Sequence, residues 1–331
     1  MQTTGTMRTH RPRGLTTSMA VMATATAELE GRLEQYRSEL TAYCYRMLAS
    51  PFDAEDAVQE TFVRAWRGFA GFDHRASLRT WLYRIATNVC LDLLGGKERR
   101  ARPMDFGPAS APVLENLREL PEVTWVQPLP DPAERTVERD TIRLAFVAAL
   151  QKLPPRQRAV LILCEVLHWK AAEAAELLGT TTASVNSALQ RARAALSESE
   201  VAKTDDAVDE ELLARYVKAF EDYDLDALTA LIQEDATQSM PPYDLWLSGR
   251  DNILTWWFGP GIGCEGSRVV PAGRANGAPA FAQYKPADDG GYEPWALQVL
   301  ELSAGRVVEF TFFLDTETLF PLFGLPSRLE A

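Results

Sequence analysis

The feature that most constrains this 331-residue chain is a pair of short helical patterns separated by a glycine near its middle. The first pattern covers residues 170–178 and is rich in alanine, glutamate and leucine, which favour helix. Gly179 suits the left-handed backbone at which helices often end, and the hydroxyls of residues 180–182 suit a helix N-terminus. The second pattern covers residues 182–196. Together the two patterns predict a helix-turn-helix.

The second helix of this motif has two distinct faces. Its apolar residues recur at helical spacing and are expected to face inward: Val185, Leu189, Ala192 and Leu196. Its open face carries hydroxyl, amide and guanidinium groups: Ser184, Asn186, Ser187, Gln190, Arg191 and Arg193. Such groups hydrogen-bond base edges and phosphates in the major groove. We therefore expect this helix to bind DNA.

Charge is distributed unevenly along the chain. The net charge is −12, which argues against indiscriminate binding to nucleic acid. Residues 1–195 carry a net charge of +3, whereas residues 196–331 carry −15. The two halves are therefore expected either to attract each other or to compete for one partner.

Neither a metal site nor a membrane segment is expected. The four cysteines are far apart in the sequence, and the three histidines have no metal-ligand spacing. No apolar run approaches the roughly 20 residues that a membrane helix needs. Residues 1–26 lack the apolar stretch of a secretory signal and are expected to be a disordered tail. A cytoplasmic location is the expectation.

Composition divides the rest of the chain. Residues 27–100 have a helical pattern, with helices expected over 29–48, 50–69 and 78–93. Residues 101–133 hold seven prolines and are expected to be a linker. Residues 134–200 read as four more helices that include the helix-turn-helix. Residues 205–331 begin with two helices and continue with strand patterns over 267–274, 279–285, 294–303 and 305–315, which predicts a separate α+β domain.

Two blocks of the chain resemble one family. Residues 53–66, Phe72 and residues 78–92 resemble region 2 of the extracytoplasmic-function (ECF) sigma factors of the sigma-70 family. Leu153-Pro-Pro-Arg-Gln-Arg158, followed by the helix-turn-helix, resembles their region 4. The resemblance implies a promoter-specificity subunit of bacterial RNA polymerase, with core polymerase and promoter DNA as partners, no cofactor and no enzymatic activity.

The resemblance also implies roles for particular residues. Asp53, Asp56, Gln59 and Glu60 would dock on the clamp helices of the polymerase β′ subunit, and β would be a further contact. Arg79, Trp81, Arg84 and Asn88 would open and read the −10 element, because cations and aromatic rings suit single-stranded DNA. Asn88 falls where family members read a flipped base, whereas Trp81 is also compatible with a core position.

The predicted −35 reader departs from the commoner pattern of the family. Asn186 and Ala188 stand where basic residues are frequent on the exposed face. Arg191 and Arg193 are left as the chief contacts to phosphate or guanine, which weakens the nonspecific electrostatic contribution. The sequence therefore does not predict which −35 element is read.

The C-terminal part resembles the SnoaL-like branch of the nuclear-transport-factor-2-like fold. Residues 246–254 are similar to a strand–turn–helix of that fold, and Trp295–Phe313 to its closing hairpin. A SigG- and SigJ-like subset of ECF sigma factors carries such a fusion, and the apolar stretch Trp125–Asp131 is similar to their linkers. That stretch is compatible with a turn packed on a neighbouring domain and with a dedicated binding peptide.

The expected cone-shaped pocket leaves three roles open: catalysis, ligand binding and protein contact. Catalysis would need a carboxylate of raised pKa and an oxyanion donor. Candidate carboxylates are Asp244, Asp251 and Asp315, candidate donors are Tyr243, Tyr284 and Trp256, and no histidine follows His168. We expect no catalytic residues here.

The predicted fold is multidomain: two all-α sigma domains followed by an α+β SnoaL-like cone. The acidic C-terminal domain is expected to dock on regions 2 and 4 and to set their spacing. The alternative is a helix-turn-helix regulator fused to a ligand-binding or catalytic pocket domain. The region 2 block argues against that alternative.

Overall fold

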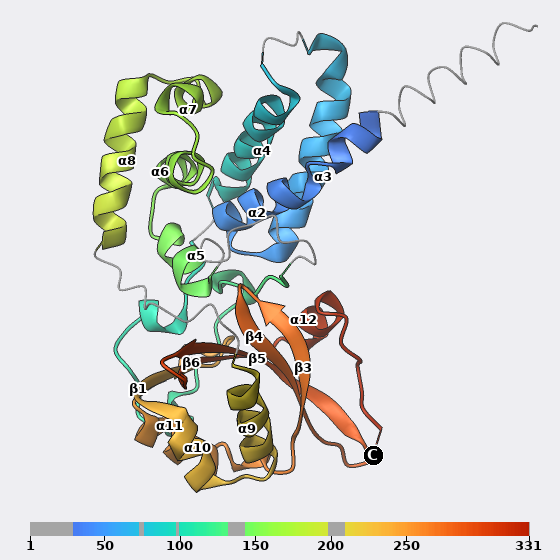
Figure 1. Ribbon diagram of the computed structural model, residues 1–331, viewed down its shortest axis with the longest axis vertical. Helices are drawn as coiled ribbons and strands as arrows, with labels where there is room; N and C mark the ends of the chain where they lie inside the picture. The colour runs from blue at the N-terminus through green and yellow to red at the C-terminus, as the bar shows by residue number, and fades with distance from the viewer. Residues whose placement is uncertain (1–28, 73–75, 97–98, 132–142, 198–208, 331) are drawn as a thin grey trace, which may run out of the picture.

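The computed structural model describes residues 29–72, 76–96, 99–131, 143–197 and 209–330. Figure 1 shows helices packed together above a curved sheet that carries its own helices. The predicted tail over residues 1–26 lies outside the described residues, as do residues 134–142 of a predicted helix.

The first helical group covers residues 29–96. Residues 29–34 are helical, and the elements that follow are α2 (Arg37–Leu48), α3 (Pro51–Gly68), the 3-10 turn η1 (Phe69–Gly71) and α4 (Leu78–Leu94). Serine hydroxyls cap both long helices: Ser50 Oγ accepts from the Asp53 amide at 3.3 Å, and Ser77 Oγ accepts from the Thr80 amide at 3.0 Å. Helices α3 and α4 start and stop within one residue of the predicted bounds, whereas a turn at residues 35–36 interrupts the helix predicted over 29–48.

The second helical group covers residues 143–197. It consists of α5 (Leu144–Gln151), α6 (Pro155–Leu161), a π-helical turn η6 (Ile162–Val166), α7 (Ala171–Leu178) and α8 (Thr182–Ser197). Gly179 separates α7 from α8 with φ of 61°, a conformation that glycine adopts at little cost. Thr181 Oγ1 accepts from the Ser184 amide at 3.1 Å, so the predicted threonine cap begins α8.

The C-terminal domain covers residues 209–330. Its helices are α9 (Glu210–Glu221), α10 (Leu225–Leu231), α11 (Arg250–Phe258) and α12 (Thr316–Leu322), with a 3-10 turn η7 (Ile262–Cys264). Its strands are β1 (Ile232–Ser239), β2 (Trp246–Ser248), β3 (Arg268–Ala275), β4 (Ala278–Pro286), β5 (Tyr292–Ser303) and β6 (Arg306–Phe313). The strand order is β2-β1-β6-β5-β4-β3, and only the β1–β6 pair is parallel.

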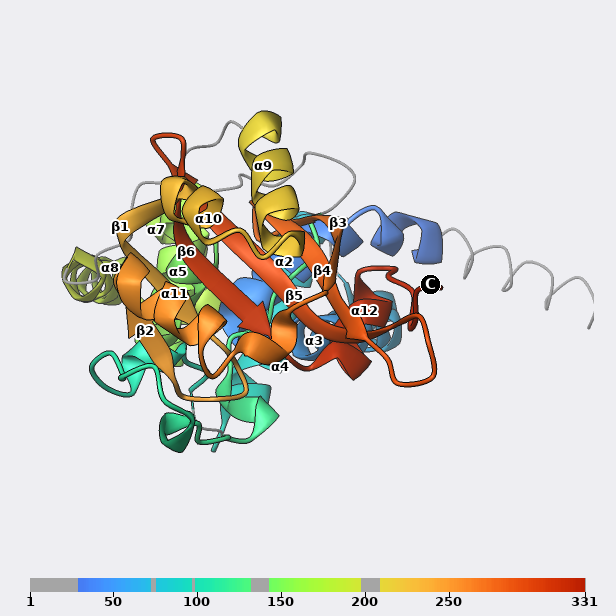
Figure 2. The same cartoon turned by 90° about the horizontal axis from the view of Figure 1, so that it is seen from below.

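The two faces of this sheet are covered differently. Figure 2 shows α9, α10 and α11 over the face seen from below, with the helical groups behind the sheet. Side chains of β4 and β5 alternate between the faces, as strand geometry requires. Phe281 and Leu300 join the core under α9–α11. Ala280, Ala282 and Leu297 join one apolar core with the helical groups and α12, so this core crosses the domain boundary.

Residues 99–131, called here the interdomain segment, follow the C-terminal domain closely. The segment contains three 3-10 turns, η2 (Pro103–Asp105), η3 (Leu114–Asn116) and η4 (Glu122–Thr124). The Leu120 amide donates to Pro242 O at 2.9 Å, and the Asp244 amide donates to Arg118 O at 3.0 Å. The stretch predicted to be a linker is therefore hydrogen-bonded to the C-terminal domain, although the second helical group lies between the two in the sequence.

Candidate DNA-binding and polymerase-binding surfaces

The face of α8 predicted to read DNA is open. Ser184, Asn186, Ser187, Gln190, Arg191 and Arg193 are all exposed, whereas Val185 and Ala192 on the opposite face are fully buried. Arg193 forms an ion pair of 2.5 Å with Glu165, with both side chains largely in solvent. Figure 1 shows α8 at the outer edge of the helical groups. The helix thus presents polar groups and two guanidinium groups without steric cover.

The N-terminal half of α4 contacts the second helical group, but Arg79 stays partly exposed and Arg84 exposed. Arg79 pairs with Glu39 at 2.8 Å, and its guanidinium lies 5.7 Å from the ring centroid of Trp169, between η6 and α7. Arg84 donates to the backbone carbonyl of Glu176 in α7 at 3.1 Å. Two of the predicted −10 residues therefore contact the second helical group, and one of them, Arg84, contacts the helix-turn-helix itself.

Trp81 and Asn88 are seven residues apart in α4 and therefore lie on the same face of the helix. Trp81 is half-buried and stacks on Phe72, with ring centroids 4.8 Å apart and an interplanar angle of 28°. Asn88 is exposed, and the structure describes no hydrogen-bond partner for its side chain. Trp81 is thus part of a small aromatic cluster that retains an exposed side, whereas the Asn88 amide faces solvent.

The predicted polymerase-binding residues lie along α3. Asp56 and Gln59 are exposed, and Glu60 forms an ion pair with Arg64 at 2.7 Å. Asp53 is only a quarter exposed and pairs with Arg100 at 3.0 Å, because the first turn of α3 lies beside the interdomain segment. Asp53 is therefore less accessible than the other three.

Sequence reasoning missed an apolar part of the α3 surface. Trp66 is 53% exposed and Val63 is 40% exposed, so both project from the helix instead of joining the core. Exposed tryptophan is enriched at protein interfaces. Their spacing outside the buried stripe of Ala54, Val58 and Ala65 is the signal that identifies them.

A buried arginine joins the two helical groups. Arg158 of α6 is 2% exposed, and its guanidinium donates to Leu150 O at 2.9 Å, to Leu153 O at 3.2 Å and also to Met47 O at the C-terminal end of α2. Burial lowers the pKa of Arg158 to about 10, so the group stays charged at neutral pH. The charge is held by carbonyl dipoles, including those at the negative end of a helix.

Three parts of the chain meet at a buried polar junction. Tyr45 of α2 donates its hydroxyl to Gln127 O at 2.7 Å and accepts from Asn276 Nδ2 at 2.8 Å. Asn276 lies in the β3–β4 turn with φ of 55°, and its Oδ1 accepts from the Leu129 amide at 2.8 Å. Burial raises the pKa of Tyr45, so the hydroxyl remains a donor. The stretch 125–131 is therefore packed between α2 and the C-terminal domain.

A second polar contact joins α5 to the sheet. Arg143, immediately before α5, pairs with Glu301 of β5 at 2.6 Å, with side chains 7% and 12% exposed. Arg102 of the interdomain segment pairs with Glu309 of β6 at 3.2 Å. The acidic C-terminal domain thus uses carboxylates to contact one arginine of the second helical group and one of the interdomain segment, and it contacts the first helical group through the hydrogen bond between Asn276 and Tyr45.

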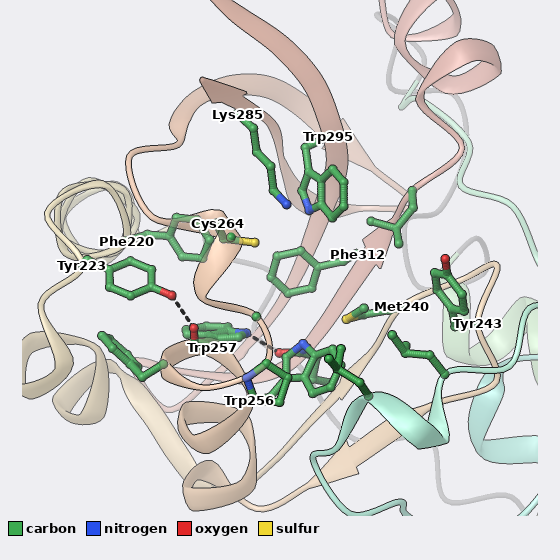
Figure 3. Close-up of a pocket in the computed structure, with 18 of the residues that line it drawn as sticks. Phe220, Tyr223, Met240, Tyr243, Trp256, Trp257, Cys264, Lys285, Trp295 and Phe312 are labelled. Atoms are coloured by element: carbon green, nitrogen blue, oxygen red, sulfur yellow. Dashed lines mark hydrogen bonds between the residues drawn. The ribbon is translucent and has the colours of Figure 1, made fainter. Parts of the chain in front are cut away.

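The C-terminal domain contains an apolar cavity of about 230 Å³. Figure 3 shows it between α11, the end of β4 and β6, with aromatic walls that include Trp256, Trp257 and Phe312. Tyr243 and Trp256 line it as expected, but Tyr284 bonds to Pro326 O elsewhere. Asp244, Asp251 and Asp315 are absent from the lining, which contains no aspartate, glutamate or histidine. The candidate catalytic carboxylates are therefore not assembled.

Family models match three parts of the chain. The model of sigma-70 region 2 matches residues 33–100, that of sigma-70 region 4 matches residues 143–196, and that of the SnoaL-like domain matches residues 213–310. The order of the three is the order predicted from the sequence.

Relatives with known names extend this finding. The ECF RNA polymerase sigma factor SigG of Mycobacterium tuberculosis is 47% identical over 317 residues, which cover 91% of this chain and 85% of SigG. SigW of Bacillus subtilis is 32% identical over 162 residues, which cover 49% of this chain and 82% of SigW. The chain belongs to the ECF RNA polymerase sigma factors. This family directs transcription initiation, so the chain is not an enzyme, as predicted.

The crystal structure of the ECF sigma factor SigJ of Mycobacterium tuberculosis has the same fold. Its TM-score is 0.62 at 22% sequence identity, and the match covers 90% of this chain and 99% of SigJ. The predicted fold class, two helical sigma regions followed by an α+β SnoaL-like domain, is confirmed. Among the described helices, none is long and apolar enough to span a membrane.

Proposed function

We propose that this sigma factor reads the −35 element through the exposed face of α8, contacts −10 DNA through α4, and binds core polymerase through α3. The observation that carries the proposal is the α8 face, where six polar side chains are exposed above a fully buried Val185 and Ala192. A helix with this arrangement presents hydrogen-bonding groups to a major groove. The chain would act in the cytoplasm, where bacterial RNA polymerase transcribes.

The contacts of α4 add a conformational requirement. Arg79 contacts Trp169 and Arg84 contacts Glu176, and we infer that these contacts are released when the two arginines bind DNA, although Arg84 is already exposed in this structure. We infer that the C-terminal domain favours this closed arrangement, since it contacts both the first helical group through Tyr45 and the second through Arg143.

Run-off transcription with purified core polymerase tests the proposal. The full chain is expected to bind core and to produce a transcript that depends on one promoter sequence. A regulator that acts without core would bind DNA in the absence of polymerase and produce no transcript with core. Failure to bind core together with no promoter-specific transcript would contradict the assignment of α3 and α8.

The α8 reader gives a prediction about base contacts. Gln190→Ala and Arg191→Ala are each expected to weaken binding to the cognate promoter by about 1–3 kcal/mol, the value of a good bidentate base contact. Arg193→Ala is expected to weaken binding to all sequences alike. It should also reduce the slope of log K against log salt concentration by about 1, as the loss of one phosphate contact does. Filter binding or fluorescence anisotropy at several salt concentrations would measure both effects.

The control for this series is Arg215→Ala, which removes an exposed arginine from α9 in the C-terminal domain. It should change neither affinity nor salt slope. Equal effects of the three α8 substitutions on cognate and random DNA would show that this helix does not read bases.

The exposed Asn88 gives a prediction about promoter opening. Asn88→Ala is expected to leave duplex binding unchanged but to slow open-complex formation, because an unstacked base exists as a partner only after melting. Permanganate reactivity of promoter thymines with core polymerase would report the difference. Asn252→Ala, which changes an exposed asparagine on α11, serves as the control. If Asn88→Ala gave the same thymine reactivity as wild type, Asn88 would not contact the −10 element.

A further inference from the structure

The cavity of the C-terminal domain has walls from two parts of the chain. Most of its lining comes from α9–α11 and the sheet, but Leu114 and Leu117 of the interdomain segment complete it. Figure 3 shows the interdomain segment passing the side of the cavity near Met240 and Tyr243. Leu117 also packs against the buried core of the domain, whereas Leu114 is 56% exposed. The segment that connects regions 2 and 4 therefore forms one wall of the cavity.

The cavity is apolar and aromatic apart from a few groups. Gln238 is already engaged, because its Oε1 accepts from Trp257 Nε1 at 2.6 Å. The thiol of Cys264 and the ammonium of Lys285 face the same space in Figure 3. An engineered apolar cavity of about 150 Å³ binds benzene, so a volume of about 230 Å³ has room for a molecule of about two fused rings.

Lys285 carries the ammonium group among the described residues that line this cavity. Its Nζ lies 3.0 Å from the ring centroid of Trp295, and in the described part of the chain no carboxylate forms an ion pair with it. The side chain is half-buried, and this burial lowers the pKa of Lys285. An ammonium removed from water is stabilised by an anion in hydrogen-bond reach.

The geometry points to a ligand site for a planar aromatic carboxylic acid, with the carboxylate on Lys285 Nζ and the rings between the aromatic side chains and the interdomain leucines. The Lys285 ammonium selects an acid over the matching neutral molecule, because the described lining residues include no other charged side chain. The flat aromatic walls favour stacked rings. A ligand seated there contacts Leu117 and so acts directly on the segment that joins the two promoter-reading regions.

Binding of 2-naphthoate and 2-naphthamide to the full chain tests the site. The two probes share one ring system and differ in charge, and quenching of tryptophan fluorescence together with titration calorimetry reports their affinities. We expect 2-naphthoate to bind at least about tenfold more tightly than 2-naphthamide. Lys285→Met, which keeps the length of the side chain, should remove this preference and retain amide binding.

Lys218→Met provides the matched control, because Lys218 is an exposed lysine on α9 outside the cavity. Its preference for the acid should equal that of wild type. Equal affinity of the wild type for both probes, absence of binding by either, or a preference that survives Lys285→Met would each overturn the site.

Hydrogen exchange tests the involvement of the interdomain segment. The amides of Leu120 and Asp244 bond the segment to the domain at 2.9 and 3.0 Å. Bound 2-naphthoate is expected to slow their exchange, because the ligand adds contacts to Leu117. If 2-naphthoate bound but the exchange rates of both amides stayed unchanged, the inference that the ligand stabilises the interdomain segment would be wrong.

Discussion

Arg158→Met is expected to lower the free energy of unfolding by about 3–5 kcal/mol and to loosen region 4 from region 2. The guanidinium supplies donors to the carbonyl of Met47 and to the turn between α5 and α6. Methionine fills much of the volume but donates nothing, so two or more buried carbonyl oxygens lose their partner at about 1–3 kcal/mol each. Urea denaturation followed by tryptophan fluorescence would measure the loss.

Arg156→Met is the control for this substitution, because Arg156 occupies the same helix and is exposed. It should change stability by less than about 0.5 kcal/mol, as surface substitutions usually do. Similar stabilities of the two variants would show that Arg158 does not join the helical groups.

The Arg143–Glu301 contact gives the second large effect. Arg143→Met leaves Glu301 in a site where its side chain is 12% exposed and its principal cation is gone, which should cost about 3–5 kcal/mol. Arg143→Met with Glu301→Leu removes both charges and should recover most of that loss, because no uncompensated charge remains buried. Thermal melting of the single and double variants is the measurement.

Function should change in the same variants. With region 4 released from β5, Arg143→Met is expected to give more promoter-specific transcript per molecule of folded protein than wild type. Arg306→Met, which removes an exposed arginine of β6, should match wild type in melting and transcription. A double variant as unstable as the single one would show that the pair is not a compensated buried contact.

Local signals in the sequence predicted most elements. Ser50, Ser77 and the threonines after Gly179 cap helices because hydroxyl side chains satisfy the first amides of a helix. Ala304 and Gly305 form the predicted β5–β6 turn, with both residues at positive φ. Strand β1 was missed, because its sequence, Ile-Gln-Glu-Asp-Ala-Thr-Gln-Ser, has few apolar residues to reveal a strand. Its position depends on pairing with β6, which is distant in sequence.

The surfaces could be predicted only in part. Helical periodicity correctly placed the α8 residues on an open face, because exposure there depends on the helix alone. The contacts of Arg79 and Arg84 depend on Trp169 and on Glu176 of α7, and the pairing of Asp53 depends on Arg100, so none of them follows from a local pattern. The cavity was expected, but the candidate carboxylates Asp244, Asp251 and Asp315 are absent from its described lining, and Lys285, which lines it, was not identified from the sequence.

The path of the interdomain segment determines how domains of this chain can be exchanged with those of relatives. Residues 99–131 belong by their contacts to the domain over 209–330, although regions 2 and 4 flank them in the sequence. A chimaera cut between region 4 and the SnoaL-like domain would therefore separate Leu117 and Leu129 from the surface that they contact in this structure. Exchange of this domain between relatives requires two grafts, residues 99–131 and 209–330, taken from the same parent. The segment and the domain are accordingly one structural unit, although they are two separate stretches of sequence.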